Sequence, residues 1–202
     1  MTLLIIRHGE SEADLLNIHE GRADYKLTSH GHDQAEAMAA YVKAHYKVSK
    51  IYSSTLTRAK QTAQHLSTAV SCPVILEPLL MEFNNGLIAG MNKQDAAKKY
   101  PIVPNIPIHA SVYKQESMLE FRFRADHILS KIISECTQED TVVIVSHGGM
   151  INQLYRSFLR LPVDSDIFFG TGDTGIHEWN LHADRHMIIK SNQLAHLQNI
   201  LE

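Results

Sequence analysis

Cysteine is scarce in this chain of 202 residues: only Cys72 and Cys136 occur, far apart and in no metal-like spacing. This excludes a disulfide framework or a thiolate metal centre as the organising feature, and a reducing, cytoplasmic setting is expected. Long apolar runs are also lacking, so no segment is expected to span a bilayer. The first residues show neither the basic region nor the cleavage site that are typical of a secretory signal.

A strong excess of charge is lacking as well, because the formal net charge is -3 with histidine counted as neutral. A general attraction to nucleic acid or to an anionic membrane is therefore not expected, and an anion must be bound by a local cluster of arginines. What is present is typical of a folded globular protein, with 44% hydrophobic and 20% charged residues. The length suits one domain with a full core, or at most two small domains.

Two apolar strand-like runs each end in a His-Gly pair. The first run leads into Arg7-His8-Gly9, and the second, residues 141–146, leads into His147-Gly148. Ligands bind at the carboxyl ends of strands in open α/β sheets, so parallel neighbours would bring the two histidines together. An arginine at the end of a buried strand requires an anionic partner, which is either a structural carboxylate or a ligand.

Strand-like and helix-like segments alternate along the chain. We predict an α/β fold of three layers, with a mostly parallel sheet, an antiparallel edge strand and helices on both faces. The expected strands are 2–6, 50–54, 73–76, 141–146 and a hairpin of 175–181 with 186–191 around Ala183-Asp184, and the expected helices are 30–46, 56–69, 93–99, 117–136 and 148–160. Residues 1–202 form a single domain in this interpretation. The segment 77–115, rich in proline and glycine, is predicted to be a cap over the site.

Arg58 is expected in the first turn of a helix, where backbone N–H groups and the helix dipole favour an anion. A guanidinium group also offers a planar fork that matches a phosphate. Together with Arg7 and the two histidines, this indicates a phosphate pocket. A neutral imidazole has a lone pair at physiological pH and can be the nucleophile in phosphoryl transfer.

Four motifs, in order, resemble the histidine phosphatase superfamily, the phosphoglycerate-mutase-like group, and within it the phosphatase branch. They are Arg7-His8-Gly9-Glu10-Ser11, Gly21-Arg22 with Leu27-Thr28 and Gly31, Ser53-Ser54 with Arg58-Ala59 and Gln61-Thr62-Ala63, and Ser146-His147-Gly148-Gly149. The resemblance implies that His8 becomes a phosphohistidine while its other ring nitrogen donates to a nearby carbonyl. Arg7, Arg58 and His147 would bind the phosphoryl oxygens, and Glu82 would be the general acid and base. No cofactor and no metal are implied.

The same resemblance implies further substrate-binding positions, which are Ser11, Asn17, Gly21, Arg22, Thr174 and Gly175. Arg22 fits either the pocket or a salt bridge. The chain departs from the family at Asp14, where an Asn is common and where a carboxylate would repel a phosphate. Three alternatives follow: the Asp14 side chain points away from the phosphate, it pairs with an arginine, or Asn17 binds the phosphate in place of the family's Asn. The residues after Glu82, 84–90, depart from the family as well.

The remaining candidates receive structural interpretations. The metal-like spacing of His182 and His186 is interrupted by an expected turn, so no metal site is predicted. Arg122 and Arg124 are expected on a solvated helix face. Three aromatic residues are expected to pack within the cap rather than to contact the substrate, and they are Tyr100, Tyr113 and Phe121.

The function that these observations indicate is a metal-independent phosphomonoesterase acting on a small phosphorylated metabolite through a phosphohistidine. Such an enzyme is a phosphoric monoester hydrolase of the histidine acid phosphatase type. The alternatives are a phosphoglycerate-type phosphomutase, whose known members resemble this chain less well, and a non-catalytic phosphate-binding protein on the same fold. The expected partner is the small substrate, with neither nucleic acid nor membrane. The oligomeric state stays open, a homodimer included.

Overall fold

A computed structural model describes residues 1–182 and 185–198, and its six strands form one sheet in the order β3-β2-β4-β1-β5-β6. The strands are β1 (Thr2–Arg7), β2 (Lys50–Ser53), β3 (Val74–Leu76), β4 (Thr141–Ser146), β5 (Ile176–His182) and β6 (Arg185–Gln193). The first four run parallel, and β5 and β6 add an antiparallel hairpin at one edge. The α/β prediction is confirmed. The turn predicted at Ala183-Asp184 lies outside the described residues.

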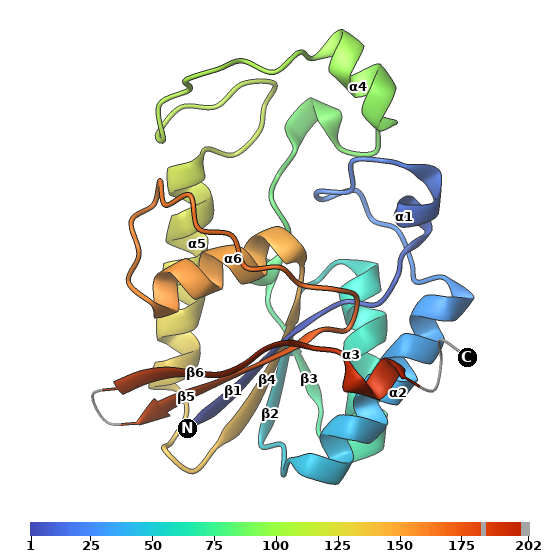
Figure 1. The fold of residues 1–202 in the computed structure, drawn as a ribbon, viewed down its shortest axis with the longest axis vertical. Coiled ribbons are helices and arrows are strands. Elements are labelled where there is room, and N and C mark those ends of the chain that lie inside the picture. Colours follow the sequence, from blue (N-terminus) through green and yellow to red (C-terminus); the bar gives the residue numbers. More distant parts are fainter. Residues whose placement is uncertain (183–184, 199–202) are drawn as a thin grey trace.

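Helices cover both faces of the sheet (Figure 1). The long ones are α2 (Ser29–His45) and α3 (Thr57–Val70) on one face and α5 (Met118–Ser134) and α6 (Gly148–Phe158) on the other. The short ones are α1 (Glu12–Leu16), α4 (Lys93–Lys99) and the 3-10 turns Pro78–Leu80, Gly86–Ile88 and Ala195–Leu197. Local signals define several helix ends. Thr28 accepts the N–H of Gly31 at the start of α2, and Ser117 begins α5 with a capping box.

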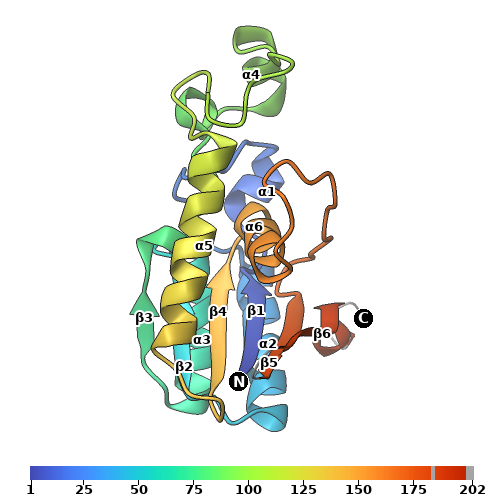
Figure 2. The ribbon, with the colours of Figure 1, turned by 90° about the vertical axis from the view of Figure 1, so that its left-hand side faces the viewer.

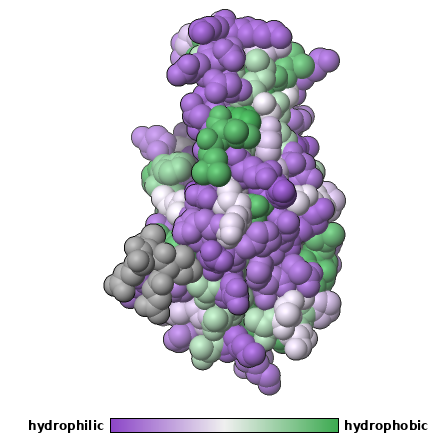
Figure 3. Space-filling view, turned by 90° about the vertical axis from the view of Figure 1, so that its right-hand side faces the viewer, coloured by the Kyte–Doolittle hydropathy of each residue, from purple (hydrophilic) through white to green (hydrophobic). Residues whose placement is uncertain are grey.

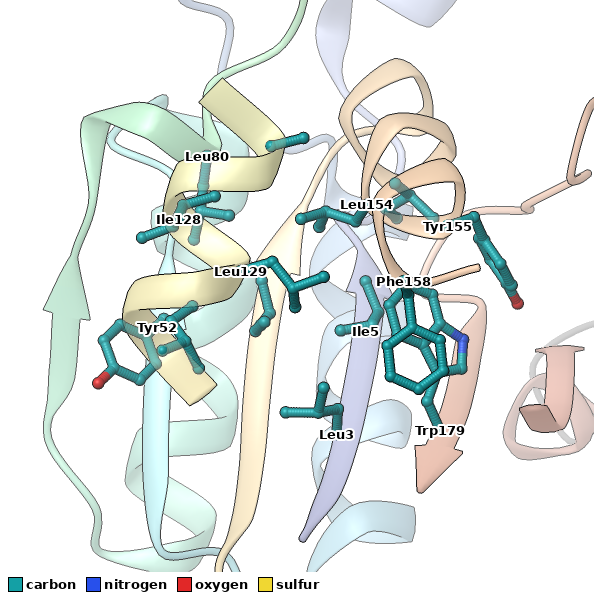
Figure 4. Packing of buried hydrophobic residues seen from close by; sticks show 14 of the residues in the cluster. Leu3, Ile5, Tyr52, Leu80, Ile128, Leu129, Leu154, Tyr155, Phe158 and Trp179 are labelled. Atoms are coloured by element: carbon teal, nitrogen blue, oxygen red, sulfur yellow. The ribbon is translucent and has the colours of Figure 1, made fainter. Parts of the chain in front are cut away.

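The core lies in two layers, one on each side of the sheet. Alternate residues of β1 point to opposite faces, so Leu3 and Ile5 pack under α5 and α6 while Leu4 and Ile6 pack under α2 and α3. Figure 4 shows the first layer, in which the ring of Phe158 stacks on Trp179 at a centroid distance of 4.7 Å. A strand that is buried on both faces has a continuous run of apolar residues in its sequence, and β1 and β4 show this pattern.

The carboxyl ends of β1 and β4 lie side by side, since Arg7 is paired with Ser146 in the parallel register. In Figure 2 the arrows of both strands point toward the end of the molecule where α1 and α4 lie. The segment 77–115 extends beyond this end. Backbone hydrogen bonds join this segment to the loop after α1. The amide of His19 donates to the carbonyl of Met91, and the amide of Gly90 donates to the carbonyl of His19.

The outer face over α1 and α2 is mostly hydrophilic, with an apolar patch on its upper half (Figure 3). Leu15 and Leu16 of α1 are among the exposed apolar side chains of the protein. Within residues 1–182 and 185–198, none of the helices is both long enough and apolar enough to cross a membrane.

Candidate active site

The register of β1 and β4 brings the two strand-end histidines together. The rings of His8 and His147 have centroids 5.0 Å apart and are tilted by 58°. Both rings are buried, with 1% and 0% of each residue exposed. The sequence prediction that these histidines emerge at the same sheet edge is therefore confirmed.

One tautomer of His8 is fixed by its neighbours. Its Nδ1 lies 2.8 Å from the carbonyl oxygen of Gly9, which can only accept, so Nδ1 carries the proton. Its Nε2 accepts a hydrogen bond from Nε of Arg58 at 3.2 Å. Burial, and then the charges of Arg58 and Arg7, lower the pKa of His8 well below its usual value. The ring is consequently neutral at physiological pH, with its lone pair on Nε2.

Arg58 lies in the first turn of α3 and is fully buried. Its guanidinium group is held by the loop between α1 and α2. Its two terminal nitrogens donate to the carbonyls of Gly21 and Ala23 at 2.9 and 3.0 Å. These bonds leave the Nε edge of the guanidinium facing His8. Burial lowers the pKa of Arg58 from its usual value, and the nearby carboxylates oppose this.

His147 stands at the N-terminus of α6. Its Nε2 lies 2.8 Å from the hydroxyl of Ser54, which follows β2. Its Nδ1 is buried without a hydrogen-bond partner among the described residues, as is Nε of Arg7. Burial is the largest cause that lowers the pKa of His147, followed by the charge of Arg58.

Arg7 is paired with Asp173, since its terminal nitrogen lies 3.2 Å from the carboxylate, and it also donates to the carbonyl of Thr171. The predicted rim residues Thr174 and Gly175 follow directly in the chain. The amide of Thr174 donates to the carbonyl of His8 at 3.3 Å, and the carbonyl of Gly175 accepts the amide of Arg7. The structure thus places both beside the end of β1. Their role toward a substrate stays a prediction.

The Glu82 carboxylate is fixed by two backbone amides. Phe83 donates to Oε1 at 2.7 Å, and Gly149 of α6 donates to Oε2 at 2.8 Å. A Cβ at position 149 would lie 2.4 Å from Oε1, so only glycine admits the carboxylate here without a shift. Glu82 is thereby joined to the helix that begins directly after His147.

The prediction for Arg122 and Arg124 is wrong, because neither lies on a solvated face. Arg124 donates to the carbonyls at 79, 81 and 82 and forms a two-pronged ion pair with Glu116 at 2.7 and 2.9 Å. Glu116 in turn accepts the amide of Asn84. The chain on both sides of Glu82 is therefore held by α5. Arg122 is buried against Asp126 and the carbonyl of Leu161.

Glu20 was not singled out in the sequence, yet its carboxylate lies beside His8 and Arg58. Its Oε1 is 3.6 Å from Nε of Arg58, and its Oε2 is 3.9 Å from Nε2 of His8. The buried hydroxyl of Ser11 donates to the same carboxylate. The one feature of the sequence that could have pointed to Glu20 is its position directly before the Gly21-Arg22 motif.

Among the described residues Asp14 forms no ion pair with an arginine, which removes one of the three alternatives. Its Oδ2 accepts the amide of Ser11 at 2.9 Å and completes a capping box at the start of α1. Asn17 ends α1 in the left-handed conformation and is exposed. Its role in substrate binding stays a prediction.

Arg22 forms a salt bridge, as one of its two alternatives predicted. Its terminal nitrogen lies 3.6 Å from the Glu116 carboxylate, and its Nε donates to the carbonyl of Glu82.

All three aromatic residues pack on other side chains of the 77–115 segment, as predicted. Tyr100 and Tyr113 pack on each other in the 77–115 segment, with ring centroids 5.0 Å apart. Phe121 packs on Phe83 of this segment, with ring centroids 5.3 Å apart, and is also part of the core layer under α5 and α6. In the part of the chain that the structure describes, no group of three or more side chains is arranged to hold a metal ion.

Two buried histidines, two arginines and a fixed carboxylate at one sheet edge define an α/β protein with a site suited to a phosphoryl group. The model of the histidine phosphatase superfamily (branch 1) matches residues 3–193, and the chain belongs to this family. It is 32% identical over 163 residues to a 2,3-bisphosphoglycerate-dependent phosphoglycerate mutase of Brucella ovis, across 76% of this chain and 79% of that protein. It is 27% identical over 199 residues to phosphoserine phosphatase 1 of Hydrogenobacter thermophilus, across 96% and 93%.

The fold also matches a solved structure, that of the alpha-ribazole phosphatase from Shigella flexneri. The TM-score is 0.87 at 24% identity, across 96% of this chain and 98% of that one. At this identity the likeness shows the fold alone.

Proposed function

We propose that the protein hydrolyses phosphate monoesters of small metabolites, without a metal, through a phosphohistidine on His8. The observation that carries the proposal is the lone pair on Nε2 of a neutral, buried imidazole, directed toward Arg58 and next to His147. The unpartnered Nδ1 of His147 and Nε of Arg7 support it, because buried polar atoms of this kind cost about 1–3 kcal/mol and a phosphoryl oxygen would satisfy them.

In the first step Nε2 of His8 attacks phosphorus, the P–N bond forms and the P–O bond to the alcohol breaks. Arg7 and Arg58 stabilise the charge on the phosphoryl oxygens in the transition state. The carboxyl of Glu82 protonates the leaving oxygen, a contribution of about 10²–10⁴ in rate for a positioned acid. Nδ1 keeps its proton throughout and donates it in a hydrogen bond to the carbonyl oxygen of Gly9.

In the second step the Glu82 carboxylate takes a proton from a water molecule as that water attacks phosphorus. The P–N bond breaks, orthophosphate leaves and His8 is neutral again. Glu82 has then regained the proton that it gave to the alcohol, so the cycle closes. The finer classification, a histidine acid phosphatase, belongs to this same proposal.

The direct test is phosphate release from an aryl phosphate and from a panel of phosphorylated metabolites, with a chelator present. The panel includes phosphoserine and alpha-ribazole phosphate, since relatives carry those names. We expect turnover in the chelator and its loss in His8→Ala, whose circular dichroism spectrum stays that of the wild type. A strict metal requirement, or wild-type turnover by His8→Ala, would contradict the mechanism.

A phosphomutase is the second candidate, favoured by the 32% identity to the Brucella ovis mutase. Both enzymes would form the same phosphohistidine, and they differ in whether water or a second hydroxyl accepts the phosphoryl group. Following 3-phosphoglycerate by ³¹P NMR separates them, because a phosphatase yields orthophosphate and a mutase yields the 2-phosphate isomer. A non-catalytic phosphate-binding protein would yield neither.

A further inference from the structure

Glu20 lies in the space that a phosphoryl group would need. A reacting phosphorus atom stands about 3–3.5 Å from its nucleophile, and its oxygens extend further. The Oε2 atom of Glu20 is 3.9 Å from the nucleophilic Nε2 of His8, and Oε1 is 3.6 Å from Nε of Arg58. A carboxylate and a phosphoryl group therefore compete for one place.

The charges of the site agree with this competition. Each of the two arginines already has a carboxylate partner, with Asp173 on Arg7 and Glu20 on Arg58. A phosphate ester carries a charge between -1.5 and -2 near neutral pH. Such an anion gains little from Arg58 while the Glu20 carboxylate stays ionised in the same place.

We propose that Glu20 is a built-in competitor for the phosphate position, and that it admits the phosphoryl group by taking up a proton. This inference rests on the proposed function, since it concerns the same pocket. It makes Glu20 a residue that sets the affinity for phosphate and its dependence on pH. It assigns Glu20 no part in bond making or breaking.

The direction of the pH effect follows from the surroundings of Glu20. Burial raises the pKa of the Glu20 carboxyl, and Arg58 is the strongest group that opposes this. The other charged or hydrogen-bonding groups that face it come from β1, from the start and first turn of α1 and from α3, and they are Arg7, His8, Ser11, Asp14 and Arg58. A bound phosphate dianion would raise this pKa further. Binding is then coupled to proton uptake, so the affinity falls as the pH rises.

The test measures orthophosphate binding by calorimetry between pH 5.5 and pH 8, for the wild type and for Glu20→Gln. Glutamine keeps the size and the acceptor oxygen but cannot be an anion. We expect Glu20→Gln to bind orthophosphate about tenfold more tightly at pH 8, as for a site that is competent about a tenth of the time. The difference should shrink toward pH 5.5. In buffers of different ionisation enthalpy, the wild type should take up more protons per phosphate than Glu20→Gln does.

Asp14→Asn is the matched control, because it also removes one negative charge nearby and asparagine can still accept the amide of Ser11. Its affinity should change far less than that of Glu20→Gln. Equal tightening in both variants would show a general charge effect and overturn the inference. Equal affinity of the wild type and Glu20→Gln at every pH, or weaker binding by Glu20→Gln, would overturn it as well.

The outcome is separable from that of the proposed function. If the wild type turns over esters and binds phosphate but Glu20→Gln shows no pH-dependent gain, the inference about Glu20 fails alone. If neither protein binds orthophosphate and neither hydrolyses an ester, both the proposed function and the inference fail.

Discussion

The imidazole of His8 is kept neutral by its burial and by the two arginines that would bind a phosphoryl group. The same environment lowers the pKa of His147. A histidine in water would lose its nucleophilicity below about pH 6.5. In this site the lone pair stays available in weak acid, so an acid limb of activity near pH 6.5 should not come from His8.

The role of Glu82 can be tested by changing the leaving group. Glu82→Gln keeps the size of the side chain but removes the proton that would be given to the alcohol. We expect kcat on alkyl phosphates to fall by about 10²–10⁴, the usual contribution of a general acid, and kcat on p-nitrophenyl phosphate to fall far less. Steady-state kinetics on both esters gives the answer, and equal losses on the two would argue against an acid role.

Arg124 holds the chain around Glu82, so its loss should disturb the acid as well as the fold. Arg124→Gln removes the two-pronged ion pair of the buried Glu116 carboxylate and leaves it the longer contact with Arg22, a change that costs up to about 3–5 kcal/mol of unfolding free energy. It should also make kcat on alkyl phosphates fall more than kcat on p-nitrophenyl phosphate.

Arg122→Gln, two residues earlier on α5, is the matched control for this effect. It breaks a buried contact with Leu161 that lies away from Glu82. Urea unfolding should show a loss of stability in both variants, but only Arg124→Gln should change the ratio of the two rates. An unchanged ratio in Arg124→Gln would reduce Arg124 to a purely structural residue.

At the scale of elements, the first turn of α6 admits the Glu82 carboxylate because residue 149 is a glycine and has no Cβ. Gly149→Ala places a methyl group against the Glu82 carboxylate, while alanine favours the helix by up to about 1 kcal/mol over glycine. We expect thermal unfolding at an equal or higher temperature together with slower hydrolysis of alkyl phosphates. Gly148→Ala is the control, because its Cβ would meet only Thr171 at 3.8 Å. Equal activity of the two variants would contradict the placement of Glu82.

The elements themselves were predictable because their signals are local. The apolar runs ending in His8 and His147 required only strand length and a glycine turn, and the register then brought the rings together. The error at Arg124 has a different origin. Helical periodicity identifies the apolar face of α5, but it does not show that a distant segment covers the polar face, where Arg124 meets three carbonyls.

Glu20 and Asp173 could not be found for the same reason. A carboxylate in a loop has no periodicity, and its pairing with Arg58 or Arg7 depends on how loops far apart in the chain pack at the sheet edge. Glu82 was predicted from the resemblance alone. Its fixation by the amide of Gly149 is a property of the assembled site.

At the scale of the whole molecule, stability should fall in weak acid because of a buried histidine outside the reacting cluster. Burial lowers the pKa of His177 to about 4, and its Nδ1 accepts from the hydroxyl of Tyr155 and the amide of Asn192. The unfolded chain therefore binds the proton more readily between about pH 6.5 and pH 4, and stability is lost as the pH falls through that window.

We expect His177 to account for up to about 2 kcal/mol of the unfolding free energy lost between pH 7 and pH 5. His177→Gln should be less stable than the wild type at pH 7 but should show a flatter dependence on pH, measured by urea unfolding at several pH values. His45 is an exposed histidine, so His45→Gln is the control and should keep the steep wild-type dependence. Parallel curves for the wild type and His177→Gln would refute this assignment.

The central claim concerns a phosphoryl group on one nitrogen. The most direct measurement is rapid quenching of the enzyme with a ³²P-labelled ester, followed by a test of the labelled protein in acid and base and by peptide mapping. The account predicts a label that is stable in base, labile in acid, located on His8 and absent in His8→Ala. A label on a serine, or turnover with no labelled protein at any quench time, would contradict it.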